Sequence, residues 1–205
     1  MHAIDAQAYK ATGLLGIHWR TRAVAPQVAA MHEYSWQPER SSTAFWAEWA
    51  LGQFGPSAAP GAAAVFASID SFSTPRPVNW RTGPGTLAAD GGQCAAVAAQ
   101  YGFVDAFEQL RSLVALDIAN GDADLNTLER FSYWASSMAY MRGIARFECD
   151  WANYAAELAA VQKIADRGAQ IAAAQGPLMA ARVSLVANAT RMIWDHLARV
   201  SSLGE

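Results

Sequence analysis

Four residues near the start of the chain, His18, Trp19, Arg20 and Arg22, have side chains that can hold and act on a polar ligand. They follow directly on the apolar run Leu14–Ile17. An imidazole can transfer a proton near neutral pH, an indole can stack on a sugar ring, and two guanidinium groups can grip a carboxylate. This pattern predicts a buried strand that opens onto a site for a carbohydrate or another small molecule.

Carboxyl groups that could complete a catalytic site lie beside aromatic residues at Glu48, Asp70, Glu148 and Asp150. An apolar setting raises the pKa of a carboxyl group and so suits a general acid. With His18, we take Glu48 and Asp70 as the candidate catalytic residues. The alternative is that these acids lie at the surface or pair with arginine.

A segment rich in proline and glycine, residues 73–93, adds two further candidate ligand contacts, Trp80 and Arg81. Its prolines exclude a regular helix or a central strand. A loop of about 20 residues in a compact domain is often functional. We therefore expect Trp80 and Arg81 to contribute to substrate binding.

The elements that must position these residues are helices. Proline, serine and glycine signals predict short helices over 26–37, 45–54 and 62–72, and apolar spacing predicts another over 103–120. The expected fold is mainly α, an up-and-down helical bundle with long helices, preceded by an irregular segment with at most one short strand. Residues 1–100 would carry the ligand site and residues 101–205 the long-helix bundle, together forming one compact unit.

The second half of the chain predicts two long helices. Asp124 can cap a helix of about 40 residues, well beyond the usual length, with a bend expected at Gly143 or in the region of Asn153. Gly176-Pro177 is the predicted break. A last helix over 178–200 should follow, with its apolar row facing the bundle. The members of that row are Val183, Val186, Ile193 and Leu197.

Composition narrows the classes of function. Of 205 residues, 53% are hydrophobic and 16% charged, which excludes a disordered chain. The net charge is −3, and Lys10 and Lys163 are the only lysines against thirteen arginines. This balance argues against a nucleic-acid surface and favours arginines held in specific pairs.

Cysteine usage and motifs point to no bound metal or cofactor. Cys94 and Cys149 are far apart without metal-type spacing, so two buried free thiols are expected. Phosphate-binding, dinucleotide and zinc-protease motifs are absent from the sequence. The chain contains neither an apolar run long enough to span a membrane nor an export signal, so we expect a soluble protein whose location is unknown.

Five stretches resemble a known family, the large multidomain glycoside hydrolases of the α-glucuronidase and α-N-acetylglucosaminidase type. The first two are similar to the region after the last barrel strand of these enzymes, and the others to the helical segment behind the barrel. These stretches are Gly16–Arg22, Phe45–Gly55, Trp80–Gly85, Phe103–Leu110 and Leu128–Trp134.

The resemblance implies that His18, Trp19, Arg20 and Arg22 contact substrate at the end of the last barrel strand. It also implies that catalytic carboxylates come from several barrel strands, of which this chain could hold at most one. A complete active site of that family is therefore not expected here, and any glycoside cleavage would be residual.

Three hypotheses from different classes follow. The first is a truncated glycosidase-like hydrolase with a residual sugar or carboxylate site. The second is a non-catalytic helical accessory or sugar-binding module, and the third is a promiscuous hydrolase of small esters or phosphoesters. A single strand with open edges also predicts a symmetric homodimer, with the aromatic residues of 45–54 or the N-terminal apolar run at its interface.

Overall fold

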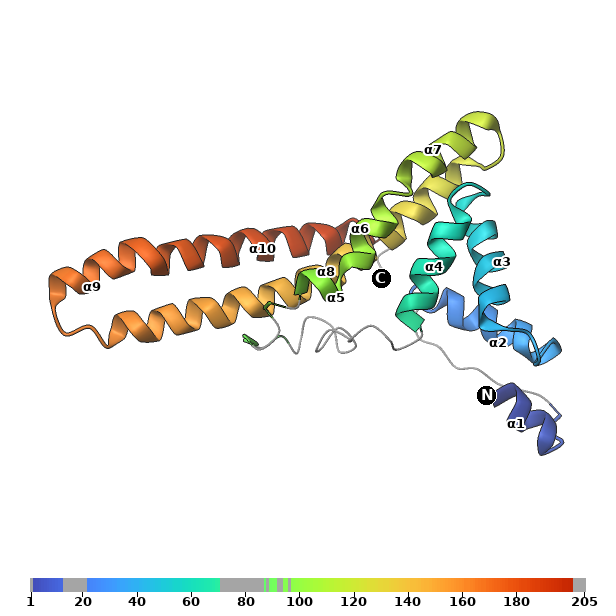
Figure 1. Cartoon of the computed structure of the whole chain (residues 1–205), viewed down its shortest axis with the longest axis horizontal. Helices are drawn as coiled ribbons and strands as arrows, with labels where there is room; N and C mark the ends of the chain where they lie inside the picture. The colour runs from blue at the N-terminus through green and yellow to red at the C-terminus, as the bar shows by residue number, and fades with distance from the viewer. Residues whose placement is uncertain are drawn as a thin grey trace.

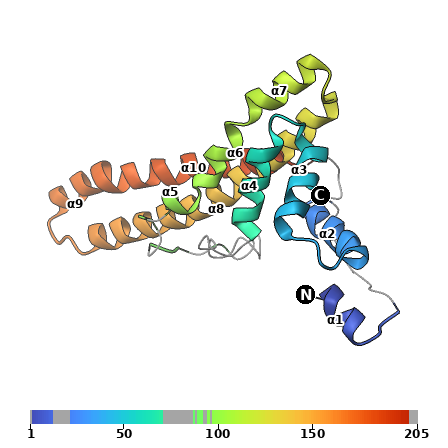
Figure 2. The same cartoon turned by 45° about the vertical axis from the view of Figure 1, so that its right-hand side comes forward.

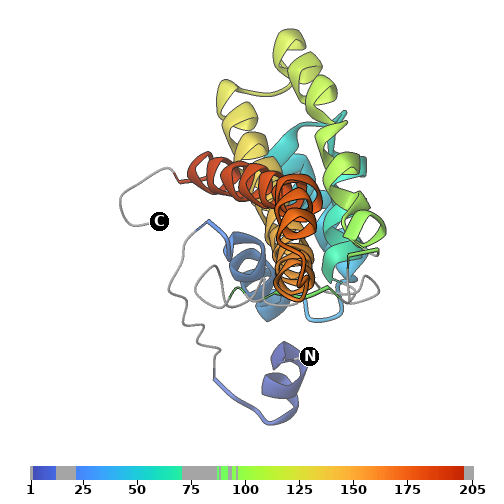
Figure 3. The same cartoon turned by 90° about the vertical axis from the view of Figure 1, so that its left-hand side faces the viewer.

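The computed structural model describes residues 2–12, 22–70, 87, 89–91, 94–95 and 97–200. Within these ranges every regular element is a helix, which confirms the mainly α prediction. The predicted strand Leu14–Ile17 lies outside the described residues, as does most of the predicted loop over 73–93. Figure 1 shows two parts, which we call the body (the described residues of 25–138) and the arm (residues 139–197). Figure 2 shows the same division, and Figure 3 looks onto the end of the arm.

The first four helices have ends set by local sequence signals. Pro26 lies in the first turn of the second helix, where its missing N–H costs nothing. Ser41 caps the third helix by accepting a hydrogen bond of 3.2 Å from the backbone N–H of Ala44, and Gly55 ends this helix at φ +84°. The four helices are α1 (His2–Ala8), α2 (Ala25–Trp36), α3 (Ser42–Phe54) and α4 (Ala59–Asp70).

The prediction of one helix over 103–120 is wrong, because two helices lie there. The chain tightens where the backbone N–H of Leu110 bonds to the carbonyl of Phe107, three residues earlier, at 3.0 Å. This tighter turn changes the direction of the chain between the two helices. Gly121 closes the second one at φ +81°, as predicted. The elements are α5 (Val97–Gln100), α6 (Gly102–Glu108) and α7 (Arg111–Asn120).

Helix α8 (Leu125–Gln162) has 38 residues and belongs to both parts of the molecule. Asp124 caps it as predicted, accepting a hydrogen bond of 2.9 Å from the backbone N–H of Thr127. The hydrogen bond from the Thr127 hydroxyl is the main cause that lowers the pKa of the Asp124 carboxyl. Because the folded pKa is lowered, the cap contributes fully at neutral pH and is lost as the pH falls through that pKa.

The chain reverses at 163–166, so the predicted break at Gly176-Pro177 is wrong. Asp166 accepts a hydrogen bond of 2.7 Å from the N–H of Ala169 and starts a new helix. Pro177 lies inside a wider π-helical turn, which accommodates its ring and its missing N–H without ending the helix. The returning helix is thus continuous, in three parts: α9 (Arg167–Ala173), η2 (Ala174–Leu178) and α10 (Met179–Leu197).

The body encloses an aromatic core. Phe107 is fully buried, stacks on Phe131 with a centroid distance of 4.7 Å and meets Phe54 edge to face at 5.4 Å. Phe45 and Trp46 are buried in the same cluster. The predicted aromatic dimer interface in 45–54 is therefore wrong for these side chains, because the chain's own core already covers them.

A disulfide joins Cys94 to Cys149, with a Cα–Cα distance of 5.2 Å, so the prediction of two free thiols is wrong. The segment before α5 runs back along α8, where the N–H of Asp90 donates to the carbonyl of Glu148 at 3.1 Å. A separation of 55 residues in sequence carried no sign of this approach in space. The bond fastens this segment to α8.

Replacing Phe107 by alanine should lower the free energy of unfolding by about 3–5 kcal/mol, because it opens a cavity among stacked rings. Chemical denaturation followed by tryptophan fluorescence measures the loss. The matched control is Leu116→Ala, at a half-exposed position of α7, which should change the free energy of unfolding by less than about 1 kcal/mol. Equal losses in the two variants would show that Phe107 is not part of a packed core.

Candidate functional site

Five of the predicted site residues, His18, Trp19, Arg20, Trp80 and Arg81, lie outside the described residues. Their assignment to a sugar or carboxylate site stays a prediction. The remaining three are placed by the structure.

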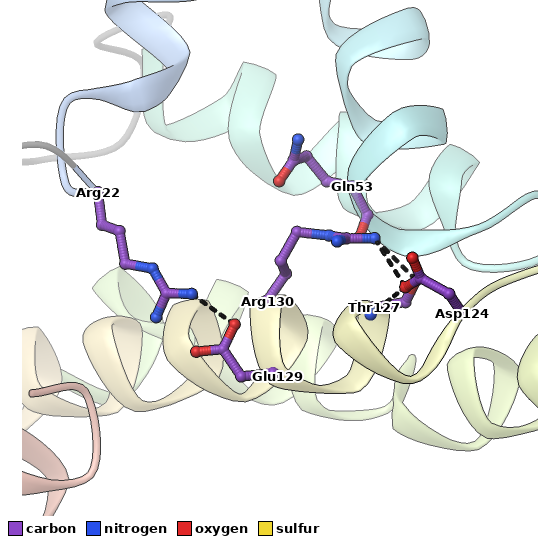
Figure 4. Close-up of polar contacts among 6 residues, drawn as sticks. All are labelled: Arg22, Gln53, Asp124, Thr127, Glu129 and Arg130. Atoms are coloured by element: carbon purple, nitrogen blue, oxygen red, sulfur yellow. Dashed lines mark hydrogen bonds and ion pairs between the residues drawn. The ribbon is translucent and has the colours of Figure 1, made fainter. Parts of the chain in front are cut away.

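Arg22 lies just before α2 and contacts the first half of α8 (Figure 4). Its guanidinium group pairs with the carboxylate of Glu129 and lies 4.9 Å from the ring centroid of Tyr133. This agrees with the expectation that arginines are held in specific pairs. Both members of the pair are partly exposed, so its contribution to stability is small.

Arg130, one residue further along α8, ties the end of α3 to the start of α8 (Figure 4). Its Nε donates to the backbone carbonyl of Gln53 at 3.1 Å, and its Nη2 donates to the Thr127 hydroxyl at 2.9 Å. Its Nη2 also lies 3.4 Å from the Asp124 carboxylate. The contacts shown in Figure 4 are thus structural fastenings between helices rather than an open site.

Among the described residues, Glu48 and Asp70 have different surroundings. The Glu48 carboxylate pairs with Arg40, which also pairs with Glu33. Asp70, at the end of α4, lines a hollow of about 70 Å³ that does not include Glu48. Ligand pockets usually begin near 300 Å³, so this hollow is too small for a sugar ring.

Two tyrosines in the body have raised pKa values. Burial is the main cause for Tyr34, followed by the charges of Glu33 and Asp70. Burial is also the main cause for Tyr101, with the charge of Glu148 second. Both phenols stay protonated at neutral pH and cannot serve as general bases there.

The apolar row predicted to face inward on the last helix faces outward, which corrects the predicted packing. Val183, Val186, Ile193 and Leu197 are 61%, 55%, 53% and 51% exposed. Met179 belongs to the same row and is also exposed. We call these five residues the outward row. Their steps of four, three, seven and four residues place them along one face of α10.

A second, more polar row of α10 packs against α8 instead. Met192 is buried and lies against Gly143, where an added Cβ would meet the Met192 Cβ at 3.1 Å. The side-chain amide of Asn188 donates to the Asp150 carboxylate of α8. These contacts need a glycine and a hydrogen-bonded pair at matching heights, which hydrophobic spacing alone does not reveal. They turn the outward row away from α8.

Metal and membrane sites find no support in the part of the chain that the structure describes. No cluster of three histidine, cysteine or acidic side chains there could hold a metal ion. Among the same residues, no helix combines the length and apolar character that crossing a bilayer requires.

No protein-family model, no curated protein and no solved structure matches this chain.

Replacing Arg130 by methionine keeps the length of the side chain but removes its hydrogen bonds to α3 and to the start of α8. We expect the free energy of unfolding to fall by about 1–2 kcal/mol, because a charged donor is lost from partly buried acceptors. Urea denaturation measures this change. Arg167→Met, which removes only an exposed contact with Gln170, is the control and should be near neutral. An unchanged midpoint for Arg130→Met would refute the fastening role.

Proposed function

We propose that this chain is a non-catalytic helical module whose arm associates with a second copy of the chain. The observation that carries the proposal is the outward row of α10, an apolar face that no described residue covers. The body supplies a folded base, and the arm supplies the surface. This corresponds to the accessory-module hypothesis and places the predicted homodimer at a new interface.

The arm needs a partner because it buries little apolar surface of its own. Among the described residues of the arm, the buried hydrophobic residues are Tyr140, Ile144, Ala145, Val161 and Met192, and most of them lie close to the body. Isolated helical pairs gain stability mainly from packing of an apolar face. A second arm laid against the outward row would supply that packing and complete a four-helix arrangement.

The size of the exposed face suits a dimer. Trp194 flanks the outward row and is 65% exposed. At roughly 100 Å² for each half-exposed side chain and more for the indole, the face approaches the ~800 Å² per partner of a standard interface. From Met179 to Leu197 it extends about 27 Å at 1.5 Å per residue.

The row is self-complementary when two copies of α10 run antiparallel about residue 188. Val183 of one copy then lies opposite Ile193 of the other, and Met179 lies opposite Leu197. Small residues flank the middle of the row, at Ala187 among others, which allows the helices to approach closely. In one chain the body lies at one end of the arm (Figure 1), so an antiparallel pairing of α10 would direct the two bodies toward opposite ends of the paired arms.

A second copy fits this face better than a lipid surface does. Helices that lie on membranes carry many lysines and arginines on their polar face. Helix α10 has only Arg182 and Arg191, and Arg191 is paired with Asp195 at 3.1 Å. Glycoside cleavage by His18 with a carboxylate stays a prediction, as does cleavage of small esters or phosphoesters.

Introducing two carboxylates into the outward row should separate the copies. For Val186→Asp combined with Ile193→Asp, light scattering at tens of micromolar should give the mass of one chain, whereas the natural chain should give twice that mass. Burying four unpaired charges at a two-fold interface is the physical cause.

The control for that experiment is Ser184→Asp, an exposed change on α10 outside the row, which should remain dimeric. A natural chain that scatters as a monomer contradicts the proposal. If that monomer binds vesicles of phosphatidylglycerol through the row, the face belongs to a membrane instead. A double variant that folds and stays dimeric places the interface elsewhere.

A further inference from the structure

The groove between α8 and α10 contains three arginines at the base of the arm. Arg142 and Arg146 of α8 and Arg191 of α10 line a hollow of about 230 Å³, together with Asn188 and Asp195. Arg142 and Arg146 lie one helical turn apart and so share a face of α8. The groove is distinct from the outward row, which lies on another face of α10.

A second hollow of about 310 Å³ continues the groove toward the disulfide. Arg146 and Asn188 line both hollows, so the two adjoin. The second hollow has apolar walls formed by Val97 and the disulfide of Cys94 and Cys149, and it is also lined by Asp150, whose carboxylate accepts a hydrogen bond from Asn188. Together the two hollows reach the size range of small-molecule pockets.

The positive charges of the groove are unequally neutralised. Arg142 pairs with Asp105 of α6 at 2.6 Å, and Arg191 pairs with Asp195 at 3.1 Å. Arg146 makes no ion pair or hydrogen bond with any residue that the structure describes. Like charges one turn apart repel one another, so an anion between Arg142 and Arg146 would relieve that repulsion.

The helix contacts set the distance between the two walls of the groove. Met192 seated on Gly143 sets the spacing of α8 and α10 next to Arg142, and Asn188 bonded to Asp150 sets it one turn beyond Arg146. The Arg142 side chain is also held by its pair with Asp105. A cation that is already held loses less entropy on binding an anion than one that must be ordered.

We propose that this groove binds a small organic anion. Its carboxylate or phosphate group is held by Arg146 with Arg142 and Arg191, and its uncharged body lies against Val97 and the disulfide. Guanidinium groups bind carboxylate and phosphate alike, because their paired N–H groups donate hydrogen bonds to two oxygens of the anion. The inference goes beyond the proposed association of arms, because its residues are not in the outward row.

The test uses benzoate and phenyl phosphate as probes, with benzyl alcohol as the uncharged counterpart, on the natural chain. Calorimetry or ligand-detected NMR should show binding of at least one anion with a Kd on the order of 1 mM, and no binding of benzyl alcohol. The anion that binds more tightly identifies the preferred head group, carboxylate or phosphate. Affinity should fall as salt is raised.

Arg146→Gln should weaken the affinity for the anion at least about fivefold, because the variant loses a charged donor. Its circular dichroism spectrum should stay unchanged, because the Arg146 side chain has no structural partner among the described residues. Arg167→Gln, the same loss of charge on the distant α9, should bind as the natural chain does. Any one of three results overturns the proposal: neither anion binds, benzyl alcohol binds as tightly as the anions, or Arg146→Gln binds the anion with undiminished affinity. Repeating the titration in the Val186→Asp, Ile193→Asp background separates this result from the outcome for association.

Discussion

The shared use of one helix, α8, is the constraint on which the rest of the structure depends. Its first half places Phe131 in the aromatic core and Arg130 against the end of α3. Its second half is the partner of α10. Because a helix is stiff over this length, the packing of the body fixes the direction of the arm. The arginine groove lies between α8 and α10 where the two parts meet, and the outward row lies on another face of α10.

The glycine contact at the junction decides which face of α10 is hidden. Met192 approaches Gly143 closely enough that a Cβ there would require its neighbour to shift. Once this contact forms, the polar row with Asn188 and Asp195 faces α8, and the valines and isoleucine face away. A helix whose more apolar row is exposed has an unsatisfied hydrophobic face, and such faces on soluble domains mark association sites. The exposure of this apolar row is thus the observation that supports the proposed association.

Sequence reasoning predicted much of the fold because caps and breakers act locally. Asp124, Pro26 and Gly121 mark helix ends through hydrogen bonds or backbone geometry within a few residues, and the structure agrees at each. Two features do not follow from local signals. Pro177 lies inside a π-helical turn instead of ending the helix, and Cys94 meets Cys149 only because of the path that the chain takes between them.

The predicted ligand site also depends on contacts between residues that are distant in sequence. Among the described residues, Arg22 has a carboxylate partner on α8, Glu48 pairs with Arg40, and Asp70 lines a separate small hollow. The arginines of the groove come from two helices far apart in sequence, so their approach cannot be predicted from spacing. Their one local sign is the helical step of four between Arg142 and Arg146. The sequence shows that the outward row is apolar but does not show which side of the helix is covered.

The central claim is that two copies meet through α10 in an antiparallel arrangement about residue 188. A single spin label at Ala180→Cys, an exposed position whose thiol is distinct from the disulfide, tests it by pulsed electron paramagnetic resonance. The labels lie eight residues from the centre in each copy, so the account predicts a separation of roughly 25 Å between them. No distance between copies, or one near 10 Å as a parallel pair would give, would contradict it.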